Sequence, residues 1–122
     1  MKKDPKKTLD LIAQTIYDKK GENIIALDVK GISSITDYVI IASANVERHS
    51  QAIAKSVIDE LKKIKERPSF IEGASDGDWI VIDYMNIMVH IFIPELRERY
   101  KLESLFSEAK IIDLNIKISN EV

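Results

Sequence analysis

Residues 37–43 read DYVIIAS, and Val39 to Ala42 form an unbroken apolar run. Successive side chains of a strand point to opposite faces, so a strand with this run is apolar on both faces through its middle. Such strands usually lie in the interior of a sheet that is covered on both sides. The segment therefore predicts a sheet with other structure packed on each face.

An amphipathic helix is predicted near the start of the chain. Pro5 suits its first turn, and Gly21 is the expected C-cap. Four apolar residues spaced i, i+3, i+4 and i+7 form one stripe on this helix: Leu9, Ile12, Ala13 and Ile16.

A second, longer helix is predicted between Asn45 and Pro68. Asn45 is its expected N-cap, Glu47 lies in its first turn, and Pro68 closes the segment. One face of this helix carries residues at helical spacing that we expect to face the core: His49, Ile53, Val57, Leu61 and Ile64.

The remaining segments are mostly short and rich in β-branched residues, as in strands. Pro94 is expected to stop the last clear strand, and short helical turns follow in residues 95–109. Residues 111–122 alternate weakly and fit either a strand or a tail. Besides residues 37–43, the predicted strands are 23–29, 70–71, 79–84 and 87–93, the last two antiparallel around Met85 and Asn86.

This order of elements predicts an α+β fold, an α/β sandwich-like arrangement in which helices flank a mixed β-sheet. Residues 1–122 are expected to form a single domain with its core at about 9–109. The C-terminal segment, 110–122, is left open as a strand or a tail.

The composition excludes several classes of function. Hydrophobic residues make up 45% and charged residues 31%, which is typical of a globular chain. The net charge of −2 argues against a general binder of nucleic acid or anionic membranes. The absence of cysteine removes disulfides, thiol catalysis and cysteine metal sites. No apolar segment follows the basic N-terminus or is long enough to span a membrane, so we expect a cytoplasmic protein.

The residues that could support catalysis form weak patterns. Two histidines, His49 and His90, have no second histidine at i+4, and packed or hydrogen-bonded structural roles are favoured for both. Asp76 and Asp78 have the D-x-D spacing of a magnesium site, but they lie in a glycine-containing loop, which favours a turn. No glycine-rich nucleotide loop and no G-x-S-x-G motif occurs.

Aromatic and acidic residues gather around the segment 79–84. Alternation places Trp79, Val81 and Asp83 on one face of this strand, and the other face, which carries Tyr84, is core. Tryptophan and tyrosine, which carry a polar group on an aromatic ring, are typical interface anchors. The alternative is a partly buried tryptophan that closes the sheet, and the residues alone favour neither.

Several short motifs follow one another in a characteristic order. They are Asp37-Tyr38, Ile71-Glu72-Gly73, Asp78-Trp79, Asp83-Tyr84, Val89-His90-Ile91-Phe92 and Tyr100-Lys101-Leu102-Glu103. This ordered set resembles the ribosomal silencing factor family, RsfS or Iojap, over about residues 9–109. The family often has a glycine in the turn where this chain has Met85 and Asn86. Methionine does not easily adopt a positive φ, so we do not expect a tight type I′ turn there.

The resemblance implies binding to the large ribosomal subunit through ribosomal protein L-fourteen. Such binding blocks association with the small subunit and represses translation. The resemblance also implies a nucleotidyltransferase-like fold without that activity, and a possible homodimer. No catalytic residue, metal, cofactor, membrane or sequence-specific nucleic acid is expected. The predicted partner-binding residues are Glu72, Asp78, Trp79, Asp83 and Tyr84.

Two alternatives stay open. One is a small Mg-dependent nucleotidyltransferase-like enzyme that uses Asp76, Asp78 and a further carboxylate. The other is a scaffold dimer without a ribosomal role.

Overall fold

Six strands form one sheet in residues 4–118, the part of the chain that the computed structural model describes. Their order across the sheet is β3-β4-β5-β2-β1-β6. β2 and β5 are parallel and the other neighbours are antiparallel, so the sheet is mixed, as predicted. The strands are β1 (Glu22–Asp28), β2 (Tyr38–Ser43), β3 (Phe70–Glu72), β4 (Trp79–Asp83), β5 (Ile87–Phe92) and β6 (Lys110–Ile112).

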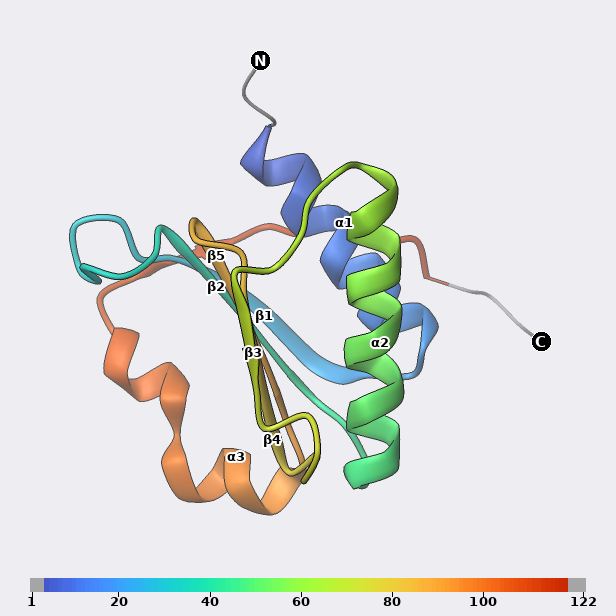
Figure 1. Cartoon of the computed structure of the whole chain (residues 1–122). Helices are drawn as coiled ribbons and strands as arrows, with labels where there is room; N and C mark the ends of the chain where they lie inside the picture. The colour runs from blue at the N-terminus through green and yellow to red at the C-terminus, as the bar shows by residue number, and fades with distance from the viewer. Residues whose placement is uncertain (1–3, 119–122) are drawn as a thin grey trace.

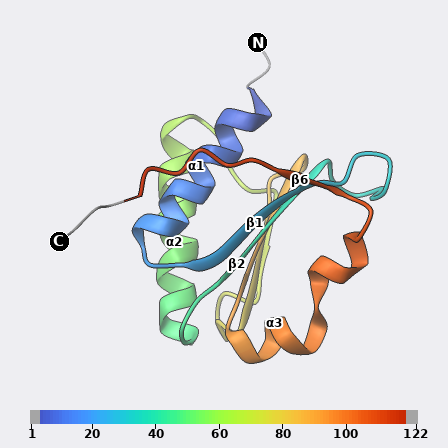
Figure 2. The same ribbon diagram turned by 180° about the vertical axis from the view of Figure 1, so that it is seen from behind.

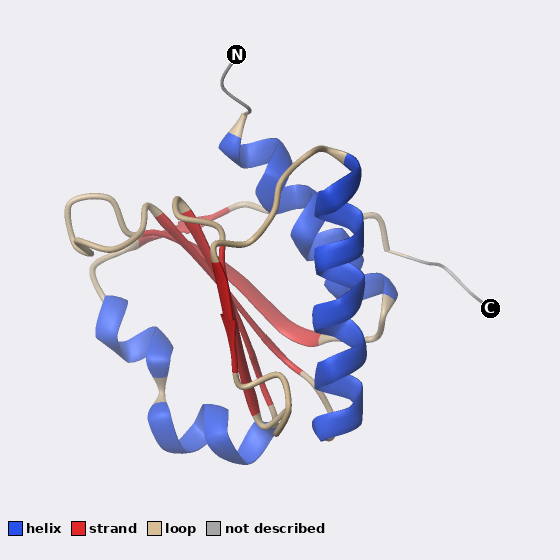
Figure 3. Cartoon of the chain, viewed as in Figure 1, coloured by secondary structure: helices blue, strands red, loops and turns tan. Residues whose placement is uncertain are grey.

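Helices cover both faces of this sheet. Two of them, α1 (Pro5–Asp18) and α2 (Glu47–Lys63), pack side by side on one face (Figure 1). On the other face lie α3 (Pro94–Tyr100) and the 3₁₀ helix η1 (Leu102–Phe106) (Figure 3). The predicted α+β class, a mixed sheet flanked by helices, is confirmed. The resemblance to the nucleotidyltransferase fold stays a prediction.

The interior position predicted for residues 37–43 is confirmed. Ile40 and Ala42 of β2 belong to the hydrophobic cluster beneath α1 and α2. Val39 and Ile41 belong to a second cluster, on the face of α3 and η1. All four residues are buried, because the two clusters sandwich β2 between them.

The apolar stripe of α1 is buried as predicted, but Gly21 is not the C-cap. Lys19 caps the helix, and Lys20 takes the left-handed conformation with φ 70°. The N–H groups of Lys20 and Gly21 donate to the carbonyls of Tyr17 and Ile16, which is a Schellman motif. Gly21 is required for another reason, since a Cβ there would lie 2.3 Å from a methyl group of Ile16.

The N-cap predicted for α2 is wrong by one residue. Val46 holds that position and offers no side-chain hydrogen bond. The ring of His49 instead binds the backbone just before the cap, because its Nδ1 accepts the Asn45 N–H at 2.9 Å. Its Nε2–H therefore donates to the Lys19 carbonyl at 2.6 Å. His49 thus ties α2 to the end of α1, which confirms the structural role predicted for it.

The turn between β4 and β5 is not of type I′, as expected, because only one of its two central residues takes a positive φ. That residue is Met85, at 77°, although methionine does not easily adopt this conformation. The Asn86 N–H donates to the Tyr84 carbonyl at 3.0 Å, as in a γ-turn of the rare, positive-φ kind. The Asp83 carboxylate accepts the Met85 N–H at 2.7 Å and stabilises this conformation.

The segment after η1 packs along β1 and α1. β6 pairs with β1, and residues 113–118 then cross α1 (Figure 2). The backbone of this segment bonds to two α1 side chains: Asp10 accepts the Asn115 N–H at 3.0 Å, and Gln14 accepts the Lys117 N–H at 2.7 Å. Asp10 and Gln14 are one helical turn apart, which matches the two-residue spacing of an extended chain.

Candidate interaction surface

One part of the sheet face that carries α3 stays uncovered. We call it the open sheet face. Strand pairing sets Phe70 opposite Asp83 and Glu72 opposite Val81, and it sets Met88 opposite Asp83. Directly paired residues point to the same side of a sheet. The open sheet face therefore consists of Phe70, Glu72, Trp79, Val81, Asp83 and Met88, all half-buried or exposed.

Trp79 lies where this face meets the α3 layer. Its ring stacks on Phe92, with centroids 4.7 Å apart, and contacts Tyr100 of α3 at 5.1 Å. Its indole Nε1–H donates to Nδ1 of His90 at 3.1 Å. Tyr100 is 51% exposed. Trp79 is thus held in one orientation while part of its ring reaches the surface.

His90 has the packed, hydrogen-bonded role predicted for it. Its side chain lies on β5 beneath Trp79 and is buried. Burial lowers its pKa from 6.5 to about 4, because the imidazolium form would lose its hydration there. Nδ1 of the neutral ring accepts the hydrogen bond from the indole N–H. The ring's own proton is therefore on Nε2.

The three acidic residues predicted to bind a partner lie around Trp79 and differ in their burial. Glu72 is exposed at the end of β3. Asp78 is half-buried just before β4, and its backbone carbonyl accepts the Ile93 N–H at 3.0 Å. Asp83 is half-buried and partly committed to the Met85 turn. The structure thus brings Glu72, Trp79 and Asp83 to one face, with Asp78 at its border.

Tyr84 is not brought to the open sheet face. It is 8% exposed and belongs to the cluster beneath α1 and α2. Its hydroxyl is buried and makes no hydrogen bond with a described residue. Desolvation, followed by the charge of Glu66, raises the pKa of Tyr84 to about 12.

We expect Tyr84→Phe to keep the fold and to raise the free energy of unfolding by about 1 kcal/mol. The substitution removes a buried polar group that lacks a partner, and such groups typically cost about 1–3 kcal/mol. Urea unfolding of the two proteins measures the difference. A loss of stability in Tyr84→Phe would show instead that the hydroxyl is satisfied in solution.

The sequence missed several members of this surface. Val81 was placed on the correct face by alternation but was not selected as a contact. Phe70 and Met88 join it only through the pairing of β3 and β5 with β4. Tyr100 lies beside it only through the position of α3. No local signal marks them, because their neighbours come from distant parts of the chain.

The D-x-D pair lies in the loop before β4, as expected, with Asp76 exposed and Asp78 half-buried. In residues 4–118 no group of three histidine or carboxylate side chains is arranged to hold a metal ion. Within the same range, no helix is long and apolar enough to cross a bilayer.

Known proteins are similar to this chain in sequence and in fold. Residues 2–121 match the family model described as ribosomal silencing factor during starvation, so the chain belongs to the RsfS family. The ribosomal silencing factor of Bacillus subtilis is 34% identical over 90% of this chain and 93% of its own length. A crystal structure from Chromobacterium violaceum superposes with a TM-score of 0.84 at 25% identity, covering 97% of this chain and 98% of that one. A mouse protein named mitochondrial assembly of ribosomal large subunit protein 1 is 28% identical over 93% of this chain and 51% of its own length.

Proposed function

We propose that this protein binds the large ribosomal subunit through ribosomal protein L-fourteen and blocks association with the small subunit. Translation is repressed by steric exclusion, without catalysis, metal or cofactor, and the protein acts in the cytoplasm. Membership of the RsfS family is the observation that carries this proposal. The name of the mouse relative, which refers to the large ribosomal subunit, supports the choice of subunit.

The open sheet face is the docking surface that we propose. It combines apolar area, from Phe70, Val81 and Met88, with a tryptophan whose orientation is fixed. A rigid aromatic side chain surrounded by smaller contacts is the usual arrangement at the centre of an interface. Because Trp79 already has its hydrogen-bond partner in His90, little side-chain entropy is lost on docking.

Charge favours a basic partner protein over ribosomal RNA. Glu72 and Asp83 lie on the open sheet face, and Asp78 lies at its border. Carboxylates repel phosphates but complement the lysine and arginine side chains that ribosomal proteins carry to bind RNA. Contacts by Glu72, Asp78, Trp79 and Asp83 are therefore part of the proposal. A contact by Tyr84 stays a prediction that requires access to a buried ring, and homodimer formation stays a prediction as well.

Co-sedimentation with purified subunits tests the proposal. We expect the protein to pellet with isolated large subunits and to stay in the supernatant with isolated small subunits. Large subunits lacking L-fourteen are the matched control and should not retain the protein. Equal retention by both subunits, or by neither, would contradict the proposed function.

A further inference from the structure

A cavity of about 570 Å³ lies between the carboxyl end of β2 and the start of α3. It is separate from the open sheet face, and the proposed function does not use it. Its polar lining comes from three segments that are distant in the sequence: Asn23, Ser43, and the stretch that carries Arg97, Glu98, Lys101, Glu103 and Ser104.

The position of the cavity follows from the topology. β2 and β5 are parallel neighbours, so their carboxyl ends lie at the same edge of the sheet. The chain leaves β2 toward α2 on one face and leaves β5 toward α3 on the opposite face (Figure 1). Where connections diverge in this way, a crevice opens beyond the strand ends, and open sheets with parallel strands bind ligands there. Ser43, the last residue of β2, and Pro94, the first of α3, both line the cavity.

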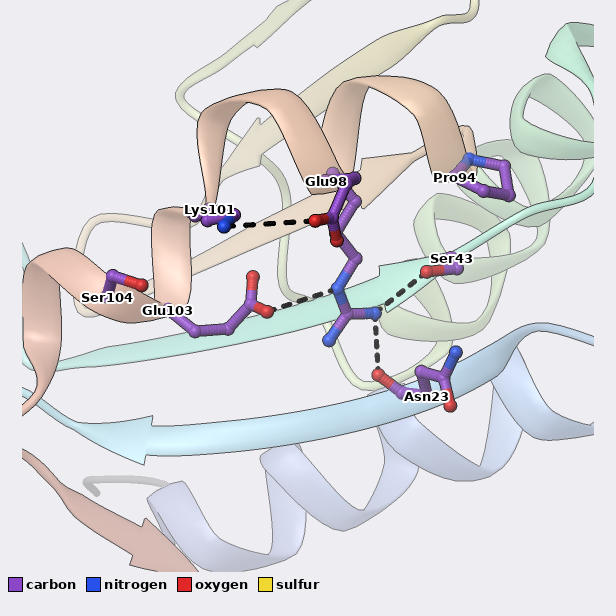
Figure 4. A pocket seen from close by; sticks show the side chains of 8 residues that line it. Asn23, Ser43, Pro94, Glu98, Lys101, Glu103 and Ser104 are labelled. Carbon is purple, nitrogen blue, oxygen red and sulfur yellow. Dashed lines mark hydrogen bonds and ion pairs between the residues drawn. The ribbon is translucent and has the colours of Figure 1, made fainter.

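Arg97 provides a fixed cation in this crevice. Its Nη1 donates to the Asn23 carbonyl at 2.7 Å and to the Ser43 hydroxyl at 2.8 Å. Its Nε lies 3.5 Å from a carboxylate oxygen of Glu103, and the side chain is only 14% exposed. Figure 4 shows Asn23, Ser43 and Glu103 converging on this group. The remaining nitrogen, Nη2, makes no hydrogen bond with a described residue, so its two N–H groups are available to a ligand.

Glu103 provides a complementary acceptor. Its Oε2 faces Arg97, whereas its Oε1 is buried and makes no hydrogen bond with a described residue. The Glu103 side chain lines the cavity and is 37% exposed, so a ligand cation can reach its carboxylate beside Arg97. Lys101 and Glu98, 3.8 Å apart, add one further charge of each sign. The lining therefore carries two cations and two anions, which suits a ligand that itself carries both signs.

We propose that this cavity binds a free α-amino acid as its zwitterion. The ligand carboxylate contacts Nη2 of Arg97 and the ammonium of Lys101, and the ligand ammonium contacts Glu103 and Glu98. The cavity volume lies within the range of small-molecule sites. Binding requires neither the ribosome nor the open sheet face.

Calorimetric titration of the full chain with glycine, L-serine, L-glutamate and L-lysine tests the proposal. Acetate and methylamine are matched controls, since each keeps one of the two charged groups of glycine. We expect saturable binding of at least one amino acid at millimolar concentration or below, and none of either control. Failure of all four amino acids to bind would overturn the proposal. So would acetate or methylamine binding as tightly as the best amino acid.

Substitutions then locate the site. Glu103→Gln and Lys101→Gln each remove one charge from the lining, and each should weaken binding about tenfold, the usual effect of losing a charged hydrogen bond. Glu60→Gln is the matched control, because Glu60 pairs with Lys63 at 2.7 Å on α2, away from the cavity. Lys101 is largely exposed, so its variant keeps the test valid if Glu103→Gln folds poorly. Wild-type affinity in both cavity variants would contradict the site.

Discussion

Trp79→Ala is expected to weaken binding to the large subunit about thirtyfold. An aromatic residue at the centre of an interface typically contributes about 2 kcal/mol or more on truncation, which corresponds to that factor. The change in the free energy of unfolding should stay below the roughly 3–5 kcal/mol of a fully buried aromatic, because the Trp79 ring is only half-buried. Equilibrium binding to large subunits and urea unfolding, measured on the same preparation, separate the two effects.

Leu105→Ala is the matched control for this prediction. Leu105 is 71% exposed on η1, outside the open sheet face, so its truncation removes apolar surface without touching the proposed interface. It should bind large subunits as the wild type does. A Trp79→Ala protein that loses its cooperative unfolding, while its folded fraction binds normally, would place Trp79 in the core and not in the interface.

The second large effect is an acid-dependent loss of stability through His90. The pKa of His90 is about 4 in the folded protein and 6.5 in the reference state, so the unfolded chain binds the proton more tightly. The stability that depends on a neutral His90 is therefore fully present above pH 6.5. It is lost progressively as the pH falls to about 4. This difference between the two pKa values corresponds to a loss of about 3 kcal/mol in the free energy of unfolding, at roughly 1.4 kcal/mol per pKa unit.

Urea unfolding at a series of pH values, with wild type and His90→Asn compared, isolates this contribution. Asparagine is neutral throughout and keeps an acceptor for the Trp79 indole, so the stability of the variant should depend less on pH between 6.5 and 4. Carboxylates titrate equally in both proteins and cancel in the comparison. Trp79 is the single tryptophan, so its fluorescence reports this neighbourhood directly. Parallel pH profiles, or a His90 titration near pH 6.5 in the folded protein, would contradict the predicted burial.

The sequence was most informative where one segment determines its own environment. The apolar run from Val39 to Ala42 predicted a strand covered on both faces, and the structure sandwiches it between two clusters. The spacing of Leu9 and Ile16 predicted the buried face of α1. Alternation along residues 79–84 separated Trp79 from Tyr84, because a strand's period of two does not depend on its neighbours.

The sequence was least informative where distant segments compete for a position. Gly21 is the residue type that usually caps a helix C-terminus, but it is needed here because Ile16 lies too close for a Cβ. Asn45 is a residue type that favours the N-cap, but Val46 holds that position. The His49 ring accepts the Asn45 backbone N–H instead. Met85 adopts a positive φ because the Asp83 carboxylate holds its N–H. Phe70 and Met88 reach the open sheet face through strand register, which local pattern does not determine.

Light scattering during the mixing of large and small subunits tests the central claim most directly. Preincubation of large subunits with the wild-type protein should reduce the association signal in proportion to the occupied fraction. The same concentration of Trp79→Ala should leave most of the signal intact, and Leu105→Ala should act as the wild type does. Normal association of large subunits that are saturated with the wild-type protein would contradict the proposal that the protein blocks subunit joining.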